Sequence, residues 1–268
     1  MLTQLQVFSI NALSLLLWLV LLCVVFVPLE RWFGLPPAAR QRRDWGHNLV
    51  YYFLSSILPA VALSAPVALL ATLAGALLPP TWPATMAALP FPARLGLAFV
   101  VGELGFYWAH RLSHQIPLLW RFHAIHHSPD HLYFMVHTRA HPVDLIVTRL
   151  FGMVLLYLLG LAGPTAAGSV VPAALLVGGA LWGFVIHANL RVRLGPLEWL
   201  VSTPFFHHWH HGRDPACSCN YASTLPLLDK LFGSLHLPAG WPDAYGTDTP
   251  VAATLGGQLA GPLGRQHD

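Results

Sequence analysis

The chain has 268 residues, of which 55% are hydrophobic and only 9% are charged, with a formal net charge of +3 at pH 7. Soluble domains carry about 25% charged residues, so this composition excludes an ordinary water-soluble domain and favours a membrane protein. The net charge is too small, and too scattered, to indicate a nucleic-acid-binding protein. The three cysteines, Cys23, Cys217 and Cys219, do not form a disulfide framework.

Five apolar stretches are candidates for membrane-spanning helices, since about 20 apolar residues cross a bilayer as a helix. They cover residues 8–28, 48–78, 92–109, 144–162 and 168–188. The last two are joined by the turn signal Gly163-Pro164-Thr165 and form either a full or a shallow hairpin. The first lacks a positively charged start and a cleavage site, so we expect a retained span and not a signal peptide. We predict an all-α integral membrane helical bundle of about four to five spans. After residue 238 the Gly/Pro/Ala-rich tail is expected to be poorly ordered.

Basic residues indicate on which side of the bilayer each loop lies. If the stretches alternate in direction, Arg94 falls on one side, and the other thirteen of the fourteen basic residues fall on or nearest the opposite side. Basic loops favour the cytosolic side, so we predict an N-terminus outside and a cytosolic C-terminus. The expected location is the inner (plasma) membrane of a bacterium, with the histidine-rich segments forming a cytosolic cap.

Eight of the sixteen histidines form three boxes. Within each box the spacing of three or four residues places the imidazoles on one side of a helix. Buried imidazoles without partners are costly, so a metal role is favoured over a structural one. Eight ligands are too many for one ion, and imidazole suits zinc, copper and iron alike, so the boxes predict a two-metal site of open identity. The boxes are His110 and His114; His123, His126 and His127; and His207, His210 and His211.

Other side chains near the boxes are candidates for supporting roles. Glu103 and Tyr107 precede His110 on the same helical stripe, where a carboxylate and a phenol can hydrogen-bond to the imidazoles. His141 and His187 lie at span ends and are either ligands or interfacial residues. His137 is expected to have a supporting or surface role. No ligand role is expected for the remaining histidines, which are His47, His131, His208, His236 and His267.

The three boxes and their flanking residues resemble the fatty acid hydroxylase superfamily, also called the sterol desaturase family of membrane di-iron oxidases. The likeness extends over about residues 95–235. Two departures are mild: Glu103 stands where the family commonly has Asp, and Ser234 where it has Thr. The matching flanks are Tyr107-Trp108-x-His110-Arg111, His126-His127-Ser128, Ala140-His141-Pro142, Asn220-Tyr221 and Leu228-Asp229-Lys230-Leu231-Phe232-Gly233.

The resemblance implies an oxidoreductase that uses dioxygen and two electrons to hydroxylate or desaturate a lipid C–H bond. Two iron ions would be held by the eight box histidines and by His187, and Asn220 would hold a metal-bound water or a ligand ring. Residues 95–238 would form the catalytic domain after an N-terminal transmembrane region, 1–94, and before the tail, 239–268. The implied partners are a fatty acyl, sterol or related lipid and an electron donor such as a cytochrome b5-like protein or a ferredoxin.

Two other functions use the same histidines. A membrane metal transporter would place ligands along a path at mid-span, whereas these histidines gather at span ends. A di-zinc membrane hydrolase would differ in its metal. The Cys217–Cys219 pair is expected to be incidental, and Asp214 and Asp229 are expected to be loop or helix-start residues. Aromatic residues that could wall a slot for lipid are Trp120, Phe122, Tyr133, Phe134, Trp182 and Phe184.

Overall fold

The computed structural model describes residues 4–35, 39–163, 166–213 and 218–264. Every element in these ranges is helical, and they contain no β-strand, so the predicted all-α fold is confirmed. The elements are α1 (Gln4–Phe33), α2 (Ala39–Ala62), α3 (Ser64–Leu77), α4 (Thr81–Ala88), α5 (Phe91–Gln115), α6 (Pro117–His123), η1 (Phe134–Thr138), α7 (Pro142–Leu158), α8 (Ala166–His187), η2 (Gly195–Trp199), α9 (Pro204–His210), α10 (Pro226–Leu231), α11 (Leu255–Ala260) and η3 (Gly261–Leu263).

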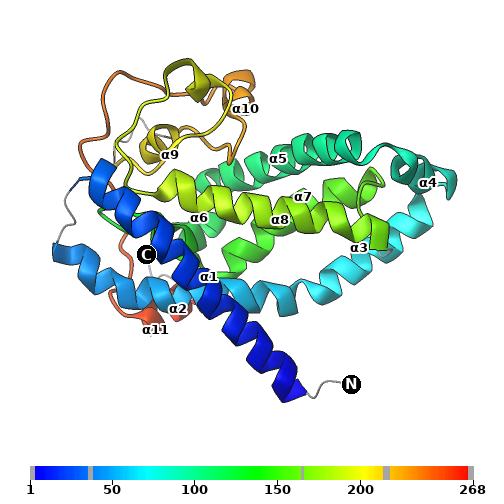
Figure 1. Ribbon diagram of the computed structural model, residues 1–268, viewed down its shortest axis with the longest axis horizontal. Coiled ribbons are helices and arrows are strands. Elements are labelled where there is room, and N and C mark those ends of the chain that lie inside the picture. The colour runs from blue at the N-terminus through cyan, green and yellow to red at the C-terminus, as the bar shows by residue number, and fades with distance from the viewer. Residues whose placement is uncertain (1–3, 36–38, 164–165, 214–217, 265–268) are drawn as a thin grey trace.

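The long helices α2, α3, α5, α7 and α8 run along the long axis of the molecule, while α9 and α10 lie at one end (Figure 1). At that end α5 finishes at Gln115 and α8 finishes at His187, and we call it the histidine end. The break after α5 has a local cause. Ile116 is extended, and Pro117 occupies the first turn of α6, a position where proline is tolerated because its missing N–H has no helical partner.

Three helical segments are long and apolar enough to cross a membrane: Ile10–Phe33, Asp44–Leu77 and Val170–His187. The pair Thr81–Ala88 and Phe91–Gln115, bent by 114°, raises the number to four if it forms one span. The sequence prediction of a further span over 144–162 corresponds to α7, which has 17 residues. Helix α7 ends early because Gly160 adopts a positive φ of 70°, and its length falls short of the roughly 20 residues that cross a bilayer.

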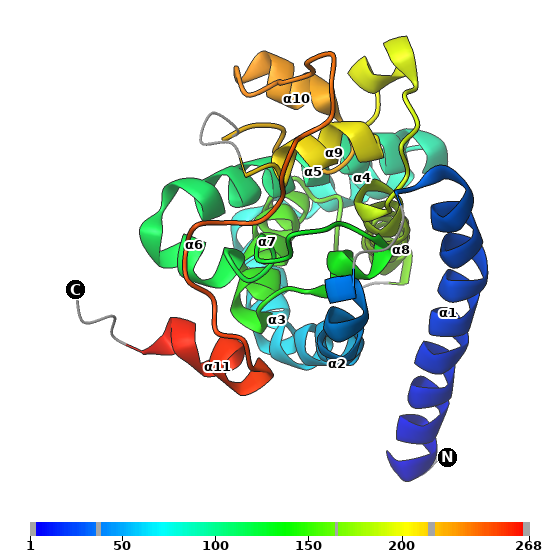
Figure 2. The same ribbon diagram turned by 90° about the vertical axis from the view of Figure 1, so that its left-hand side faces the viewer.

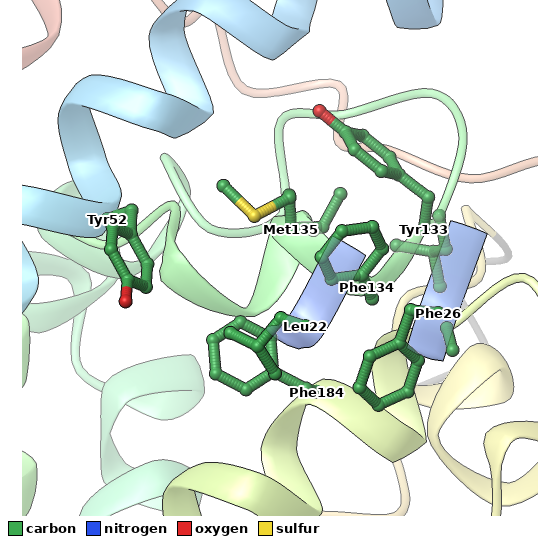
Figure 3. Packing of buried hydrophobic residues seen from close by; sticks show 10 residues of the cluster. Leu22, Phe26, Tyr52, Tyr133, Phe134, Met135 and Phe184 are labelled. Atoms are coloured by element: carbon green, nitrogen blue, oxygen red, sulfur yellow. The ribbon is translucent and has the colours of Figure 1, made fainter. Parts of the chain in front are cut away.

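Helix α1 contacts the bundle mainly through its second half. Figure 3 shows Leu22 and Phe26 against Phe134 of η1 and Phe184 of α8. The rings of Phe26 and Phe134 stack with their centroids 5.2 Å apart. Only 11% of the Ile10–Phe33 window is buried, and Figure 2 shows α1 at the side of the bundle. An apolar helix so exposed is explained by a lipid environment.

Helices α5 and α7 approach each other closely at two glycines. A Cβ at Gly105 of α5 would lie 2.7 Å from the Cα of Gly152 and 2.9 Å from the carbonyl oxygen of Phe151, both on α7. Small residues at such a crossing allow the backbones of membrane helices to touch. The contact fixes the part of α5 that leads to the first histidine box.

We expect Gly105→Val to destabilise the protein by about 1–3 kcal/mol, because the added side chain has no space at the α5–α7 crossing. The measurement is the midpoint of thermal unfolding in detergent. Gly96→Val is a matched control, since Gly96 lies on the same helix and a Cβ added there would meet nothing within 4 Å. Equal midpoints for the two variants would contradict the close approach.

The segment from residue 239 to 264 runs over the bundle, and the poor order expected from its composition stays a prediction. Its contacts are specific. Gln258 accepts a hydrogen bond from the hydroxyl of Tyr51 (3.0 Å), and Trp120 donates its indole N–H to Thr249 (2.9 Å). Composition alone does not reveal these contacts because their partners are far away in the sequence. The division into three domains stays a prediction.

Candidate metal centre

Four helices deliver the predicted histidines to one place at the histidine end. His110 and His114 lie on the last turns of α5, and His187 is the last residue of α8. The second box ends α6 and continues into the turn after it, and the third box lies on α9 and its C-cap. Helix α9 begins at Pro204, and Thr203 caps it by accepting a hydrogen bond from the backbone N–H of Phe206.

The nine predicted histidines fall into two groups. Within each group, one ring nitrogen from every member lies within 4.8 Å of the corresponding atoms of the others. The groups adjoin each other: the rings of His127 and His211, one from each group, stack with centroids 4.3 Å apart. The first group is His110, His114, His123, His127 and His210; the second is His126, His187, His207 and His211.

The hydrogen bonds of the Nδ1 atoms fix which nitrogen carries the proton in five of these rings. Each Nδ1 faces an acceptor, so it must be the N–H donor. In a neutral ring with its proton on Nδ1, the Nε2 atom has a free lone pair. The five pairs are His110 with the carbonyl of Tyr221 (2.7 Å), His123 with Asp144 (3.0 Å), His126 with the carbonyl of Arg139 (3.1 Å), His187 with that of Gly183 (2.6 Å) and His210 with that of Cys219 (2.8 Å).

The Nε2 atoms left free by these bonds face one another. His110 and His123 approach to 3.2 Å through Nε2, and His126 and His187 to 3.1 Å. In neutral rings neither nitrogen of such a pair has a proton to donate, so two lone pairs meet and repel. A cation held between the two nitrogens would remove this conflict, because both lone pairs could then bind it.

Unpartnered buried nitrogens point to the same conclusion. Nε2 of His114 and of His210 is buried without a hydrogen-bond partner among the described residues. The Nε2 atoms of His207 and His211 face each other at 3.2 Å, so they add a further close pair of ring nitrogens. Buried polar atoms without partners are rare in proteins and call for an explanation such as a bound ion. The donor set therefore fits two metal ions.

Burial keeps the imidazoles outside the spans in their neutral, metal-binding form. Burial first, and then the charge that neighbouring imidazoles would carry, holds the pKa of these histidines well below its usual range. In His210 burial lowers the pKa most, although its hydrogen bond to the Cys219 carbonyl acts in the opposite direction. Neutral imidazole is the form that binds metals. Besides His210, the histidines whose pKa is lowered in this way are His126, His127, His207 and His211.

The three residues predicted to take part in the reaction lie beside the two groups, with their polar atoms bonded elsewhere. Glu103 accepts hydrogen bonds from the backbone N–H groups of Thr224 (2.7 Å) and Leu225 (3.2 Å). The hydroxyl of Tyr107 bonds to that of Ser234 (2.7 Å) and accepts from Arg111 (2.8 Å). These contacts hold the chain after the third box against α5. A direct part in the reaction stays a prediction for both residues.

Asn220, the third of these residues, shapes the loop that follows the third box. It adopts a positive φ of 55°, which asparagine tolerates better than most residues. Its side-chain amide donates to the carbonyls of Phe206 (2.9 Å) and His236 (2.8 Å), and its oxygen accepts from the N–H of His236 (2.7 Å). These bonds place Asn220 in a structural role beside the centre, and its predicted contact with a metal-bound water or a ligand ring stays a prediction.

Asp229 fixes the same loop from its other side. Its carboxylate accepts hydrogen bonds from the backbone N–H groups of Tyr221 (2.7 Å) and Ala222 (2.9 Å) and from the hydroxyl of Ser234 (2.7 Å). Burial raises the pKa of Asp229, and these hydrogen bonds oppose the rise. The carbonyl of Tyr221 orients His110, so Asp229 helps to position His110 by holding Tyr221 in place. It lies in the first turn of α10, as predicted.

Asp144 is a functional candidate that the sequence analysis missed. It is buried in the first turn of α7, and its carboxylate is the only side-chain group among the five acceptors that orient the histidines. A signal was present in the sequence. Asp144 is the one acidic residue in the apolar stretch 144–162, and it stands three residues after His141. A carboxylate that accepts from a ligand histidine fixes the ring and raises its basicity.

The remaining histidines have other surroundings. Both nitrogens of His141 are used, since Nδ1 accepts from the N–H of Val143 (3.1 Å) and Nε2 faces the carbonyl of Leu259 (3.0 Å). His137 packs against Gly183 and Phe184, and burial together with the charge of Arg149 lowers its pKa to about 4. His208 bonds to Tyr245 and to the carbonyl of Ala188. None of the three belongs to either group.

The structure describes all six predicted slot residues but only one cysteine of the Cys217–Cys219 pair. Cys217 and Asp214 lie outside the described residues. Cys219 contributes its carbonyl to His210, and its side chain is in neither histidine group. Of the aromatic residues predicted to wall a lipid slot, Trp120 lies against His114, with ring centroids 5.0 Å apart, and Phe122 against His141. Phe134 and Phe184 belong to the core beside α1.

The chain is similar in sequence to known lipid hydroxylases and monooxygenases. The chain is 35% identical over 237 residues to the ornithine lipid hydroxylase OlsE of Rhizobium tropici, which covers 83% of this chain and 66% of that protein. It is 32% identical over 156 residues to the alkylglycerol monooxygenase of Xenopus tropicalis, covering 58% of this chain and 33% of that protein. The human alkylglycerol monooxygenase is 33% identical over 140 residues, which covers 52% of this chain and 30% of that protein.

The chain thus spans less than two thirds of the length of these relatives. No solved structure matches it. The family model for fatty acid hydroxylase matches residues 95–234, which is more than half of the chain and contains all nine histidines of the two groups. The chain belongs to the fatty acid hydroxylase family.

Proposed function

We propose that this protein is a membrane-bound lipid hydroxylase that holds two iron ions in its histidine groups. The observation that carries the proposal is the set of free Nε2 atoms that face one another in pairs. Iron held there would supply the activation of dioxygen and the oxidation of a C–H bond. The balance is R–H + O₂ + 2 electrons + 2 protons → R–OH + H₂O.

The residues of the chain have separate tasks in this proposal. The nine imidazoles hold the two ions, with Nδ1 protons kept on the five rings that face carbonyls or Asp144. The loop fixed by Glu103, Asn220 and Asp229 holds the carbonyls of Cys219 and Tyr221 in place. Burial of the histidines excludes bulk water, which would otherwise compete for the open positions on the metal.

Hydroxylation is favoured over desaturation for a geometric reason. Desaturation removes a second hydrogen from the neighbouring carbon, so two C–H bonds must be aligned, whereas hydroxylation needs only one. The names of the relatives, a hydroxylase and monooxygenases, support the same choice. The substrate would be a polar lipid of the bilayer, in line with the ornithine lipid and alkylglycerol in those names. An external donor, a cytochrome b5-like protein or a ferredoxin, would supply the electrons.

The membrane orientation belongs to the same proposal. The histidine end would face the cytosol, where a soluble reductant can reach it, and the N-terminus would lie outside in the plasma membrane of a bacterium. Several apolar helices support membrane insertion, and the bias of basic residues supports the direction. The histidines gather at one end of the bundle instead of along a path through it, which argues against a metal transporter.

The test combines metal analysis with oxygen labelling. We expect the purified full-length protein to bind two irons per chain and to give the Mössbauer spectrum of a coupled iron pair. With reductant, membrane lipids and oxygen-18 gas, a lipid product should carry one labelled oxygen atom. Two zinc ions and no iron in protein from iron-replete cells would overturn the proposal in favour of a hydrolase. An unlabelled desaturated product would overturn the choice of hydroxylation.

A further inference from the structure

A polar pocket opens at the histidine end, at the level where two candidate spans finish. Its volume is about 450 Å³, and both Leu35 and Asn189 line it. Leu35 follows the span Ile10–Phe33 by two residues, and Asn189 follows the span Val170–His187 by two. The two ends are joined, because Asn189 donates to the carbonyl of Leu35 (2.9 Å). Lipid head groups lie just beyond the ends of such spans.

Arg191 is the cation of this pocket, and it lacks a carboxylate partner among the described residues. Its guanidinium lies over the ring of Trp241 (4.5 Å) and donates to the hydroxyl of Tyr245 (3.0 Å), both of which also line the pocket. Its Nε is buried without a hydrogen-bond partner. In contrast, Arg193 forms a two-point pair with Glu198. A guanidinium held flat and left unpaired suits an acid group of a ligand.

The other charged side chains of the pocket are acidic. Asp130 and Asp243 line it together with Arg191, and one oxygen of Asp130 also faces Nδ1 of His131 (2.8 Å), which lines the pocket too. A cavity with one guanidinium and two carboxylates complements a molecule that carries both an acid group and an amine. A hydrocarbon tail would not be stable among these charged groups, and it would instead follow the apolar helices into the bilayer.

The pocket is linked to the histidine groups by His208, which lines it. His208 lies between His207 and His210 on α9, and its ring bonds to Tyr245 (2.9 Å) and to the carbonyl of Ala188 (3.0 Å). Ala188 follows His187 directly in the sequence. A molecule held by Arg191 and Tyr245 is therefore fixed relative to the metal centre through short, buried contacts.

We propose that this pocket binds the polar head group of the lipid substrate, with Arg191 facing an acid group of that head. The inference rests on the proposed function, because only that function makes the bound lipid a substrate. It adds a substrate class, namely lipids with a zwitterionic head group, and a residue that selects them.

The test is a binding measurement without oxygen or reductant, on the full-length iron-loaded protein in nanodiscs. The probes are Nα-dodecanoyl-lysine, its methyl ester, which lacks the acid group, and free lysine, which lacks the tail. We expect the acid lipid to bind about tenfold more tightly than the ester, as one charge-assisted contact provides. Free lysine should bind far more weakly than either lipid.

Arg191→Gln should remove the preference for the acid lipid, and Arg191→Lys should retain part of it. Arg31→Gln is the matched control, because it also deletes one arginine charge. Arg31 is exposed in the last turn of α1, at the histidine end, and does not line the pocket. Equal affinity of the wild type for acid and ester, a preference that survives Arg191→Gln, or free lysine binding as tightly as the lipids would each overturn the proposal.

Iron content and product formation from membrane lipids, measured on the same preparations, separate this proposal from the proposed function. Selective binding that depends on Arg191, without any oxygenated product, would overturn the hydroxylase and support a lipid head-group site. Oxygenated product with no preference between acid and ester would overturn the head-group site alone.

Discussion

Replacing His187 by alanine is expected to lower the metal content of the purified protein from two ions per chain to one. His187 belongs to the group of four histidines, and its Nε2 lies 3.1 Å from that of His126 and 3.0 Å from that of His207. Product formation should fall by at least about 100-fold, because loss of a ligand weakens metal binding more than loss of its hydrogen-bond partner does. Iron analysis and oxygen-18 incorporation measure both effects.

The control is His236→Gln. His236 packs on Trp209 near the third box, yet it is in neither group, and its contacts with Asn220 use only backbone atoms. This variant should keep two ions and most of its activity. If His187→Ala also kept two ions and full activity, His187 would not be a ligand, and the second group would hold its ion through three histidines.

Asp144→Ala is expected to weaken metal binding by about 10–100-fold, since the carboxylate that orients a ligand histidine has an effect of that size. The lost contact is the 3.0 Å hydrogen bond from Nδ1 of His123. Asp144→Asn should lie between the wild type and the alanine variant, because its amide oxygen can still accept that bond without the charge. Chelator competition, which measures the affinity for iron, is the direct readout.

Glu198→Gln provides the comparison for Asp144. Glu198 is also a buried carboxylate, but its partners are Arg193 and the N–H of Leu194, away from both histidine groups. This variant should unfold at a lower temperature with unchanged metal affinity. An iron affinity in Asp144→Ala equal to that of the wild type would show that His123 is held without the carboxylate.

Much of the fold and of the candidate site was predictable because it depends on local spacing. The apolar stretches identified α1, α5 and α8, and the histidine spacings of three and four placed the imidazoles on helix faces that the structure brings together. The family assigned from the boxes is confirmed by the family model. Binding of metal by these nine histidines stays a prediction.

What the sequence did not reveal depends on distant contacts. Asp144 meets His123 across 21 positions, and Glu103 meets Thr224 across 121, so neither pairing follows from helix periodicity. The turn at Ile116–Pro117 reverses the chain and returns His123 to His110, and its geometry is not encoded in spacing. Whether the stretch 144–162 forms a full span was left open by the sequence, because hydropathy does not register where a glycine with positive φ ends a helix, as Gly160 does after α7.

Backbone carbonyls orient most of the five histidine rings whose Nδ1 atoms are hydrogen-bonded, and this affects which substitutions the site can tolerate during evolution. Four of the five acceptors are backbone carbonyls, at residues 139, 183, 219 and 221. A substitution at any of these positions keeps the backbone carbonyl in the chain, so the acceptor itself is not removed, as at position 219 for His210. Asp144 is the exception, since a single nucleotide substitution can delete its acceptor. The acceptors of four rings therefore do not depend on a side chain, although Gly183 cannot be replaced without a clash with His137, whereas the acceptor of His123 is lost with Asp144.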